Sequence, residues 1–182
     1  MRIILLTGQP GVGKTTMAER VYHHFRDVGV KVEGVITHEA RKGERRTGFK
    51  TTDLSSGQDG WLAKKDSGRG PRIGPYRVIT DDLERIASAA LKRATRMESG
   101  LAIVDEIGPI EMTSGLFRRT VSTLFDQDRP TLATFKIGSH YPEIERLRGR
   151  SMVVEMTRDN RGQVYAALVQ FLEDSLGISK SE

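Results

Sequence analysis

Residues 2–15 read RIILLTGQPGVGKT, a short apolar run followed by a glycine-rich turn and a lysine–threonine pair. The run Arg2–Thr7 has the composition of a buried parallel strand. Beyond the turn, apolar residues recur at four-residue spacing and predict a helix over Thr15–Val28, and Val30–Thr37 predicts a second strand. Strand, turn, helix and strand form a βαβ unit, in which the two strands are parallel and the crossover is right-handed.

The rest of the chain continues this alternation after one irregular stretch. Weak strand patterns at residues 46–54 and 61–65 predict a hairpin, and the glycine- and proline-rich residues 66–75 predict a loop. The remaining expected elements are a helix at 81–97 with Thr80 as its N-cap, a strand at 101–104, a helix at 114–125, a strand at 131–135, a short helix at 142–147, a strand at 152–156 and a helix at 163–172. We therefore predict a single α/β domain over residues 1–182, a three-layer sandwich with a mainly parallel central sheet, helices on both faces and an antiparallel edge hairpin.

The turn after the first strand matches the complete pattern G-x-x-x-x-G-K-[ST], and its flanks are those of a phosphate-binding loop. Its glycines let backbone N–H groups approach a phosphate, and the helix N-terminus adds partial positive charge. Lys14 is expected to reach the β- and γ-phosphates as a catalytic residue, and the Thr15 hydroxyl to coordinate Mg²⁺. The predicted nucleotide-binding residues here are Gly8, Gln9, Pro10, Gly11, Val12, Gly13, Lys14, Thr15 and Thr16. An ordinary glycine-rich turn is the alternative, but the complete pattern favours a P-loop NTPase fold.

Two acidic residues, Asp105 and Glu106, follow the apolar run Leu101–Val104. Ligands of open α/β sheets bind at the carboxyl ends of the strands, so Asp105 is expected at the nucleotide site, holding the Mg²⁺ through water. Glu106 is expected to polarise a water molecule aimed at the γ-phosphate. That role makes it the predicted catalytic base and favours hydrolysis over transfer to an organic acceptor. Two such acids alone would favour a solvated turn, but a phosphate loop upstream favours the functional interpretation.

Basic residues are concentrated in one segment. The chain carries 29 Lys and Arg against 24 Asp and Glu, and ten of the basic residues but only four of the acidic ones lie from Arg41 to Arg77. This basic, glycine-rich insert at about 41–77 argues for a localised anionic target and against a nucleic-acid binder that is basic all over. The chain has no cysteine and no apolar stretch long enough to span a membrane. We therefore expect a cytoplasmic protein without disulfides, thiol catalysis or a membrane partner.

The order of these motifs resembles that of the small nucleoside-triphosphatase family of thermophiles and archaea, known in animals as the cancer-related nucleoside-triphosphatase. The similarity runs from Arg2 to about Gln170. Besides the phosphate loop, it rests on Thr37, Glu39 and Arg41, on Arg46-Thr47-Gly48-Phe49, on Ile73-Gly74-Pro75-Tyr76, on Asp105-Glu106-Ile107-Gly108 with Glu111, and on Asn160-Arg161. The resemblance implies a P-loop NTPase that hydrolyses ATP, GTP and other NTPs to NDP and phosphate, slowly, with Mg²⁺ and with broad base specificity. It also adds Gly108 to the predicted nucleotide-binding residues.

Several other residues have two interpretations each. Arg41, expected just past the second strand, could neutralise charge on the γ-phosphate as a catalytic arginine finger, or be a solvated surface residue. Asn160 and Arg161 could contact the base or ribose, or form a turn that caps the last helix. Thr134 could sense the γ-phosphate, although a plain strand threonine is favoured. The residues that could line the rim of the site are Arg45, Arg46, Arg69 and Arg72.

At several positions the sequence supports a functional interpretation weakly or not at all. Pro109 stands where the family commonly has lysine, and Phe135-Lys136 replaces its usual Ile-Pro, so the contacts of those residues do not carry over. Trp61 is expected to pack in the hairpin rather than to stack on a base. The four histidines have no metal-ligand spacing.

Three functions remain open at this stage. The favoured one is a Mg²⁺-dependent nucleoside-triphosphatase. The second is a P-loop kinase acting on a nucleoside, a nucleotide or a polynucleotide 5′-hydroxyl, with residues 66–77 as a closing lid. The third is an NTP-switched module that binds RNA or protein, but the insert has few aromatic stacking positions, so nucleic acid is not favoured. The base preference and the oligomeric state stay open, with a monomer favoured.

Overall fold

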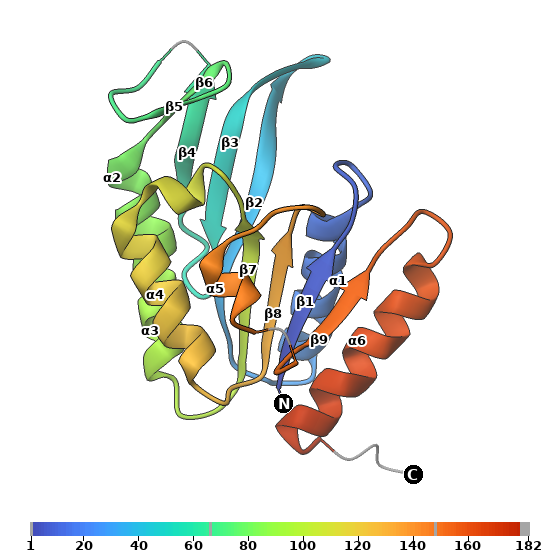
Figure 1. The fold of residues 1–182 in the computed structure, drawn as a ribbon. Helices are drawn as coiled ribbons and strands as arrows, with labels where there is room; N and C mark the ends of the chain where they lie inside the picture. Colours follow the sequence, from blue (N-terminus) through green and yellow to red (C-terminus); the bar gives the residue numbers. More distant parts are fainter. Residues whose placement is uncertain (1, 66, 148, 179–182) are drawn as a thin grey trace.

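The computed structural model describes residues 2–65, 67–147 and 149–178, which form one mixed sheet flanked by helices (Figure 1). Among these residues, nine strands lie in the order β5-β6-β4-β3-β2-β7-β8-β1-β9. The predicted α/β class is confirmed, and so is the parallel relation of the first two strands, which run in the same direction with β7 and β8 between them.

The parallel half of the sheet consists of β1 (Ile3–Thr7), the first part of β2 (Val32–Lys42), β7 (Leu101–Ile107), β8 (Thr131–Phe135) and β9 (Met152–Glu155). Figure 1 shows α1 (Lys14–Asp27) and α6 (Arg161–Leu176) on one face of this half, and α3 (Ala89–Arg96) and α4 (Gly115–Asp126) on the other. The short helix α5 (Pro142–Glu145) lies between β8 and β9 in the chain.

The alternation of side chains along the buried strands explains the two helical layers. Ile4 and Leu6 of β1 belong to a core that includes Leu168 of α6, whereas Ile3 and Leu5 belong to a separate core with residues of α3 and α4. Successive strand residues point to opposite faces of a sheet, so an unbroken apolar run requires cover on both sides.

The antiparallel extension, residues 38–78, is larger than the predicted hairpin. It is formed by the second part of β2, β3 (Arg45–Asp53), β4 (Asp59–Lys65), β5 (Arg72–Ile73) and β6 (Tyr76–Val78). The expected end of the second strand at Thr37 is wrong, because β2 continues to pair with β3 as far as Lys42. The expected loop at 66–75 is wrong in part, because Arg72 and Ile73 pair with β6; Asp66 lies outside the described residues.

The helix after β6 begins differently from the prediction. The backbone N–H of Ile79 still bonds to Leu62 in β4, and the Ile79 carbonyl accepts the first helical hydrogen bond, from Leu83. Ile79 is therefore the N-cap, and Thr80 is the first residue of α2 (Thr80–Asp82). A π-helical segment (Leu83–Ser88) joins α2 to α3, and a 3₁₀ turn (Glu111–Thr113) follows β7.

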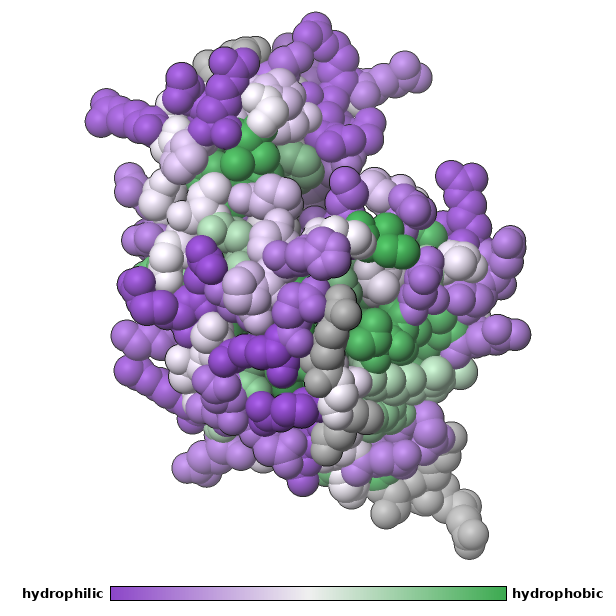
Figure 2. Space-filling view, in the orientation of Figure 1, coloured by the Kyte–Doolittle hydropathy of each residue, from purple (hydrophilic) through white to green (hydrophobic). Residues whose placement is uncertain are grey.

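The surface differs between the two halves of the molecule. Figure 2 shows hydrophilic side chains over much of the antiparallel extension and a hydrophobic area over β9 and α6. None of the helices in the described residues is both long enough and apolar enough to cross a membrane.

Candidate active site

The phosphate loop connects β1 to α1 and is shaped by glycines. Gly8 and Gly13 have φ angles of 155° and 101°, and a Cβ on Gly8 would lie only 2.5 Å from the Met156 carbonyl oxygen. L-residues rarely adopt this backbone, so the loop requires glycine at both positions. Lys14 is buried, and its Nζ donates to the Gly8 carbonyl at 3.2 Å. The loop thus holds the lysine beside a helix N-terminus whose first turn has no acidic residue.

Asp105 lies in β7 with none of its surface exposed. Its carboxylate accepts hydrogen bonds from the Thr134 hydroxyl and from the Thr37 backbone N–H. Burial raises the pKa of Asp105, while hydrogen bonds from Thr134, Thr15 and the Thr37 backbone oppose that rise. The two predicted Mg²⁺ ligands, Thr15 and Asp105, are therefore in hydrogen-bond contact with each other. Thr134 donates a hydrogen bond to the same carboxylate.

The donor atoms around Asp105 suit Mg²⁺. A carboxylate and a hydroxyl oxygen are hard ligands of the kind that Mg²⁺ takes, with water and phosphate oxygens completing its shell. Across residues 2–65, 67–147 and 149–178, no group of three or more His, Cys, Asp or Glu side chains is arranged to hold a metal by itself. A Mg²⁺ ion here would depend on the triphosphate for further ligands.

Glu106 and Glu111 form an acidic pair beside the loop. Burial, and then the charge of Asp105, raise the pKa of Glu106, whereas Lys14 and Lys136 lower it. Burial and the charge of Glu106 raise the pKa of Glu111 to about 8. Glu111 is only 4% exposed, and its burial beside Glu106 favours the neutral form of its carboxyl group.

Gly108 makes room for both carboxyl groups. A Cβ at this position would lie 2.9 Å from Glu106 Oε1 and 2.9 Å from Glu111 Oε2. Any larger residue would displace one of the two side chains, which gives a physical reason for the glycine in the motif. The resemblance placed Gly108 at the nucleotide; its contacts are with the two acids.

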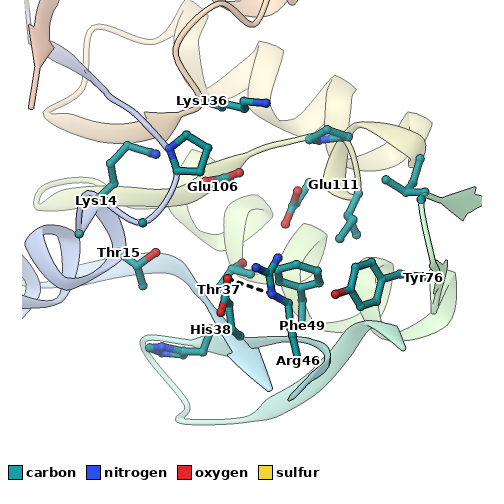
Figure 3. A pocket seen from close by; sticks show the side chains of 18 of the residues that line it. Lys14, Thr15, Thr37, His38, Arg46, Phe49, Tyr76, Glu106, Glu111 and Lys136 are labelled. Atoms are coloured by element: carbon teal, nitrogen blue, oxygen red, sulfur yellow. Dashed lines mark ion pairs between the residues drawn. The ribbon is translucent and has the colours of Figure 1, made fainter. Parts of the chain in front are cut away.

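These groups meet in a cavity of about 580 Å³ between the phosphate loop and the antiparallel extension (Figure 3). Figure 3 shows Lys14 and Lys136 on one side of Glu106, with Arg46, Phe49 and Tyr76 beyond Glu111. The lining residues are Pro10, Gly11, Gly13, Lys14, Thr15, Thr16, Thr37, His38, Glu39, Arg46, Phe49, Ile73, Gly74, Pro75, Tyr76, Glu106, Pro109, Ile110, Glu111 and Lys136. The cavity therefore joins an anion-binding end to a largely apolar end.

The apolar end is organised around an aromatic pair. The rings of Phe49 and Tyr76 have centroids 5.1 Å apart and are inclined by 72°, an edge-to-face arrangement. The Arg46 guanidinium carbon lies 5.5 Å from the Phe49 ring centroid, and its Nε is 3.2 Å from Glu39 Oε1. The pair thus lines the cavity with a cation over the Phe49 ring.

Arg41 lies away from this cavity. It is within β2 rather than past it, so the expected position is wrong. Its Nη2 is 2.6 Å from Glu39 Oε2, and its Nη1 donates to the Glu44 carbonyl. Among the described arginines, Arg46 lines the cavity, whereas the exposed Arg45, Arg69 and Arg72 do not. The arginine-finger role of Arg41 stays a prediction.

Asn160 and Arg161 lie beside the phosphate loop rather than on the cavity wall. Arg161 Nε donates to the Val12 carbonyl at 3.0 Å, and its guanidinium would lie 3.7 Å from a Cβ on Gly13. Asn160 closes a turn, since its side chain accepts from the Thr157 N–H and donates to the Glu155 carbonyl. The base or ribose contact predicted for both residues stays a prediction.

Sequence reasoning missed several residues of the site. Lys136 was set aside as a departure from the family, and its charge acts on Glu106. Sequence reasoning assigned His38 no role because the four histidines lack metal-ligand spacing. It nevertheless lines the cavity, and its charge lowers the pKa of Asp105. Only its position one residue after Thr37 at the sheet edge could have indicated this. Trp61 lies between the ammonium groups of Lys50 and Lys64, 5.1 and 4.3 Å from its ring, and is not part of the cavity lining in the described residues.

Comparisons with known proteins agree on one group of relatives. The model of a family described as "NTPase" matches residues 3–169. Nucleoside-triphosphatase THEP1 of Thermofilum pendens is 44% identical over 80% of this chain and 78% of its own length, and that of Pyrococcus abyssi is 37% identical over 94% and 93%.

Two solved structures are similar to the fold. The crystal structure of THEP1 from Aquifex aeolicus aligns with a TM-score of 0.81 and 29% identity, covering 94% of this chain and 99% of the other. The solution structure of a human cancer-related nucleoside triphosphatase aligns with a TM-score of 0.80 and 32% identity, covering 96% and 99%.

Proposed function

Because this chain belongs to the NTPase family and its activity is the hydrolysis of nucleoside triphosphates, we propose that the cavity beside the phosphate loop is where the reaction takes place. The observation that carries this proposal is the placement of Glu106. Its carboxylate lines the same cavity as Lys14 and Thr15, and the positive charges of Lys14 and Lys136 act on it. A base, a phosphate cradle and a metal-ligand pair therefore converge on one volume.

The phosphate loop binds the triphosphate. The residues of 8–16 other than Pro10 supply backbone N–H groups, and Lys14 exchanges the Gly8 carbonyl for the β- and γ-phosphate oxygens. Arg161 acts on this loop from outside, through its bond to the Val12 carbonyl, and keeps the loop in its binding conformation. Asn160 shapes the turn that presents Arg161. A contact of Asn160 and Arg161 with the base or ribose of the nucleotide belongs to the same proposal.

Thr15 and Asp105 would hold Mg²⁺, and the ion would there supply positive charge to neutralise the phosphate oxygens. Asp105 stays in place because Thr134 and the Thr37 N–H fix its carboxylate. Thr134 is thus a positioning residue, acting through Asp105 rather than by touching the phosphate.

Glu106 takes the proton from the attacking water. Burial, and then the charge of Asp105, raise its pKa, which brings its basicity closer to the working pH, and the charges of Lys14 and Lys136 oppose that rise. Glu111, protonated and buried beside it, adds no second negative charge against the incoming triphosphate. Lys136, whose charge acts on Glu106, is placed to neutralise charge that develops on the γ-phosphate, and we assign this role to it ahead of Arg41.

The same proposal also covers the range of substrates, the domain organisation, the cellular location and the oligomeric state. No residue of the phosphate loop distinguishes one base from another, so ATP, GTP and other NTPs are all substrates. The slow turnover that the family resemblance implies is part of the same proposal. Residues 1–182 act as a single domain, since both cores pack on one sheet. We propose a cytoplasmic monomer with no nucleic-acid partner.

The test replaces Glu106 by glutamine, which keeps the size of the side chain and removes its basicity. Glu106→Gln is expected to bind ATP–Mg²⁺ as wild type does while its kcat falls on the order of 10²–10⁴-fold. The exposed Glu98, outside the cavity lining, gives the matched control Glu98→Gln. Wild-type phosphate release by Glu106→Gln would remove Glu106 from the role of base.

A further inference from the structure

The apolar end of the cavity is larger than hydrolysis requires. The triphosphate, Mg²⁺ ion and water molecule of the proposed reaction would lie at the polar end, around Lys14 and Glu106. Beyond Glu106 the cavity continues between the antiparallel extension and the segment after β7, where its lining is Phe49, Ile73, Pro75, Tyr76, Pro109 and Ile110. An apolar chamber open to a reacting centre is a binding site for an organic molecule.

The order of the strands indicates on which side of the γ-phosphate this chamber lies. The phosphate loop follows β1, which has β8 and then β7 on one side and β9 on the other. If Glu106 of β7 is the base, as proposed above, the γ-phosphate points toward β7. The α-phosphate and the nucleoside then extend the opposite way, toward β9 and Arg161 at the start of α6. The chamber therefore lies beyond the γ-phosphate, away from the nucleoside.

The chamber also has the chemistry to hold a flat ring. Phe49 and Tyr76 pack against the core and on each other, yet both stay partly exposed and line the cavity, so part of their ring surface is open to a ligand. Figure 3 shows the Tyr76 hydroxyl directed into the cavity and the Glu111 carboxyl group on the wall between this pair and Glu106. A flat aromatic ring could stack on the pair while its polar atoms meet Arg46, Tyr76 and Glu111.

We propose that this chamber binds a small, flat aromatic alcohol, whose hydroxyl group takes the γ-phosphoryl group from the bound NTP. This inference rests on the proposed function, because it uses Glu106 as the base. The alcohol oxygen forms a bond to the γ-phosphorus, and the bond from that phosphorus to the β–γ bridging oxygen breaks. The NDP leaves with the bonding electron pair, and the hydroxyl proton passes to Glu106. The products are NDP and a phosphate monoester, whereas water in the same place gives NDP and phosphate.

The experiment incubates the full chain with Mg²⁺ and ATP that carries a radioactive label in its γ-phosphate, and it measures which product receives the label. Benzyl alcohol, pyridine-3-methanol and thymidine serve as acceptors, and cyclohexylmethanol serves as a matched alcohol without a flat ring. We expect labelled monoester beside labelled phosphate, with an ester-to-phosphate ratio about tenfold higher for the best aromatic alcohol than for cyclohexylmethanol. Cyclohexylmethanol performing as well as all three would overturn the proposal.

Variants locate the acceptor. Phe49→Leu and Tyr76→Leu are each expected to lower the ester-to-phosphate ratio about tenfold, because the stacking surface is lost. Trp61→Leu, an aromatic residue of the same extension outside the cavity lining, should leave the ratio unchanged. Circular dichroism of each variant identifies any that fails to fold, and the more conservative Phe49→Tyr then replaces Phe49→Leu with a smaller expected drop.

The outcomes separate the two proposals. Hydrolysis of ATP without ester from any of the three acceptors overturns the acceptor site and leaves the proposed hydrolysis intact. No turnover of ATP overturns both. The rival occupant is the base of the NTP itself. If Phe49→Leu and Tyr76→Leu raise the KM for ATP but not the KM for inorganic tripolyphosphate, which has no base, the chamber holds the nucleobase and the acceptor site is overturned.

Discussion

The two halves of the sheet hold their site residues in different ways. In the parallel half, Lys14 and Asp105 are buried, and backbone or hydroxyl groups of neighbouring strands and turns fix each of them. In the antiparallel extension, Arg46 is exposed and Phe49 and Tyr76 are half-buried, and ring contacts and one surface ion pair hold them.

This difference assigns different work to the two halves. Charged groups fixed before the substrate arrives stabilise a transition state without reorganising, and such fixation needs the buried, hydrogen-bonded strand ends of the parallel half. Half-buried rings and long arginine side chains adapt to a ligand at little cost. We therefore expect changes in the parallel half to reduce kcat and changes in the extension to alter KM or the acceptor.

The largest effect is expected at Lys14. Lys14→Met keeps an apolar stem in the buried position and removes the charge that faces the phosphates, so kcat/KM for ATP should fall on the order of 10²–10³-fold. Steady-state phosphate release measures this loss. Lys92→Met, an exposed lysine of α3, is the matched control and should behave as wild type. A Lys14→Met enzyme within about threefold of wild type would break the proposed division, because about 0.7 kcal/mol is less than a single hydrogen bond to a charged group contributes.

The next effect is expected at Gly108, where geometry rather than charge changes. In Gly108→Ala the new methyl group meets the ends of two flexible side chains, Glu106 and Glu111, so the fold should survive while Glu106 moves. A shift of about 1 Å in a catalytic group costs on the order of 10²-fold in rate, so kcat should fall between about 10- and 100-fold. Gly162→Ala, where a Cβ would meet nothing within 4 Å, is the control. If thermal unfolding shows Gly108→Ala to be unstable, the role of Gly108 is structural instead.

The parallel half could be predicted from the sequence almost entirely. Its strands are short apolar runs; the loop Gly8–Thr15 directly follows β1, and Asp105 and Glu106 directly follow the apolar run Leu101–Val104, within the last three residues of β7. Since the carboxyl ends of parallel strands meet at one edge, local patterns sufficed to bring these residues together. The lengths of elements were less well predicted, as at β2, because pairing with β3 prolongs a strand whose later residues are polar.

The extension could not be predicted to the same extent. Its strand β5 has only two residues, too few to leave a periodic pattern, and the contact between Phe49 and Tyr76 joins residues 27 positions apart in the chain. Arg41 was favoured over Arg46 because the strand was expected to end at Thr37. β2 instead continues through three further residues before Arg41, which pairs with Glu39, and it is Arg46 that lines the cavity.

A moderate effect, on stability, is expected from Glu111. Its pKa is about 4.5 in the unfolded chain and about 8 in the folded protein. The folded state therefore keeps a proton that the unfolded state loses, and the stability that this proton contributes is present below about pH 4.5 and lost as the pH rises to about 8. Glu111→Gln, which cannot ionise, should remove this part of the pH dependence, so its stability relative to wild type rises from pH 5 to pH 8.

Urea unfolding at several pH values, in buffer without nucleotide or metal, measures the difference between Glu111→Gln and wild type. Glu98→Gln is again the control, since its side chain is exposed. Parallel stability curves for wild type and Glu111→Gln would mean that Glu111 is already ionised in the folded protein. Glu106 and Glu111 would then both be negatively charged beside the γ-phosphate. In that case the parallel half would repel the triphosphate more strongly than proposed above.

The smallest effect separates Arg46 from Arg41 within the extension. Both arginines pair with Glu39, but only Arg46 lines the cavity. Arg46→Ala should raise the KM for ATP about threefold, the effect of losing an exposed charge contact worth about 0.7 kcal/mol, and added salt should reduce the difference from wild type. Arg41→Ala removes the same charge from the same ion-pair group and should change the KM by less. If instead Arg41→Ala lowers kcat more than tenfold and Arg46→Ala does not, Arg41 reaches the γ-phosphate in the nucleotide complex. The extension would then take part in the chemistry, and the division between the two halves would fail at that residue.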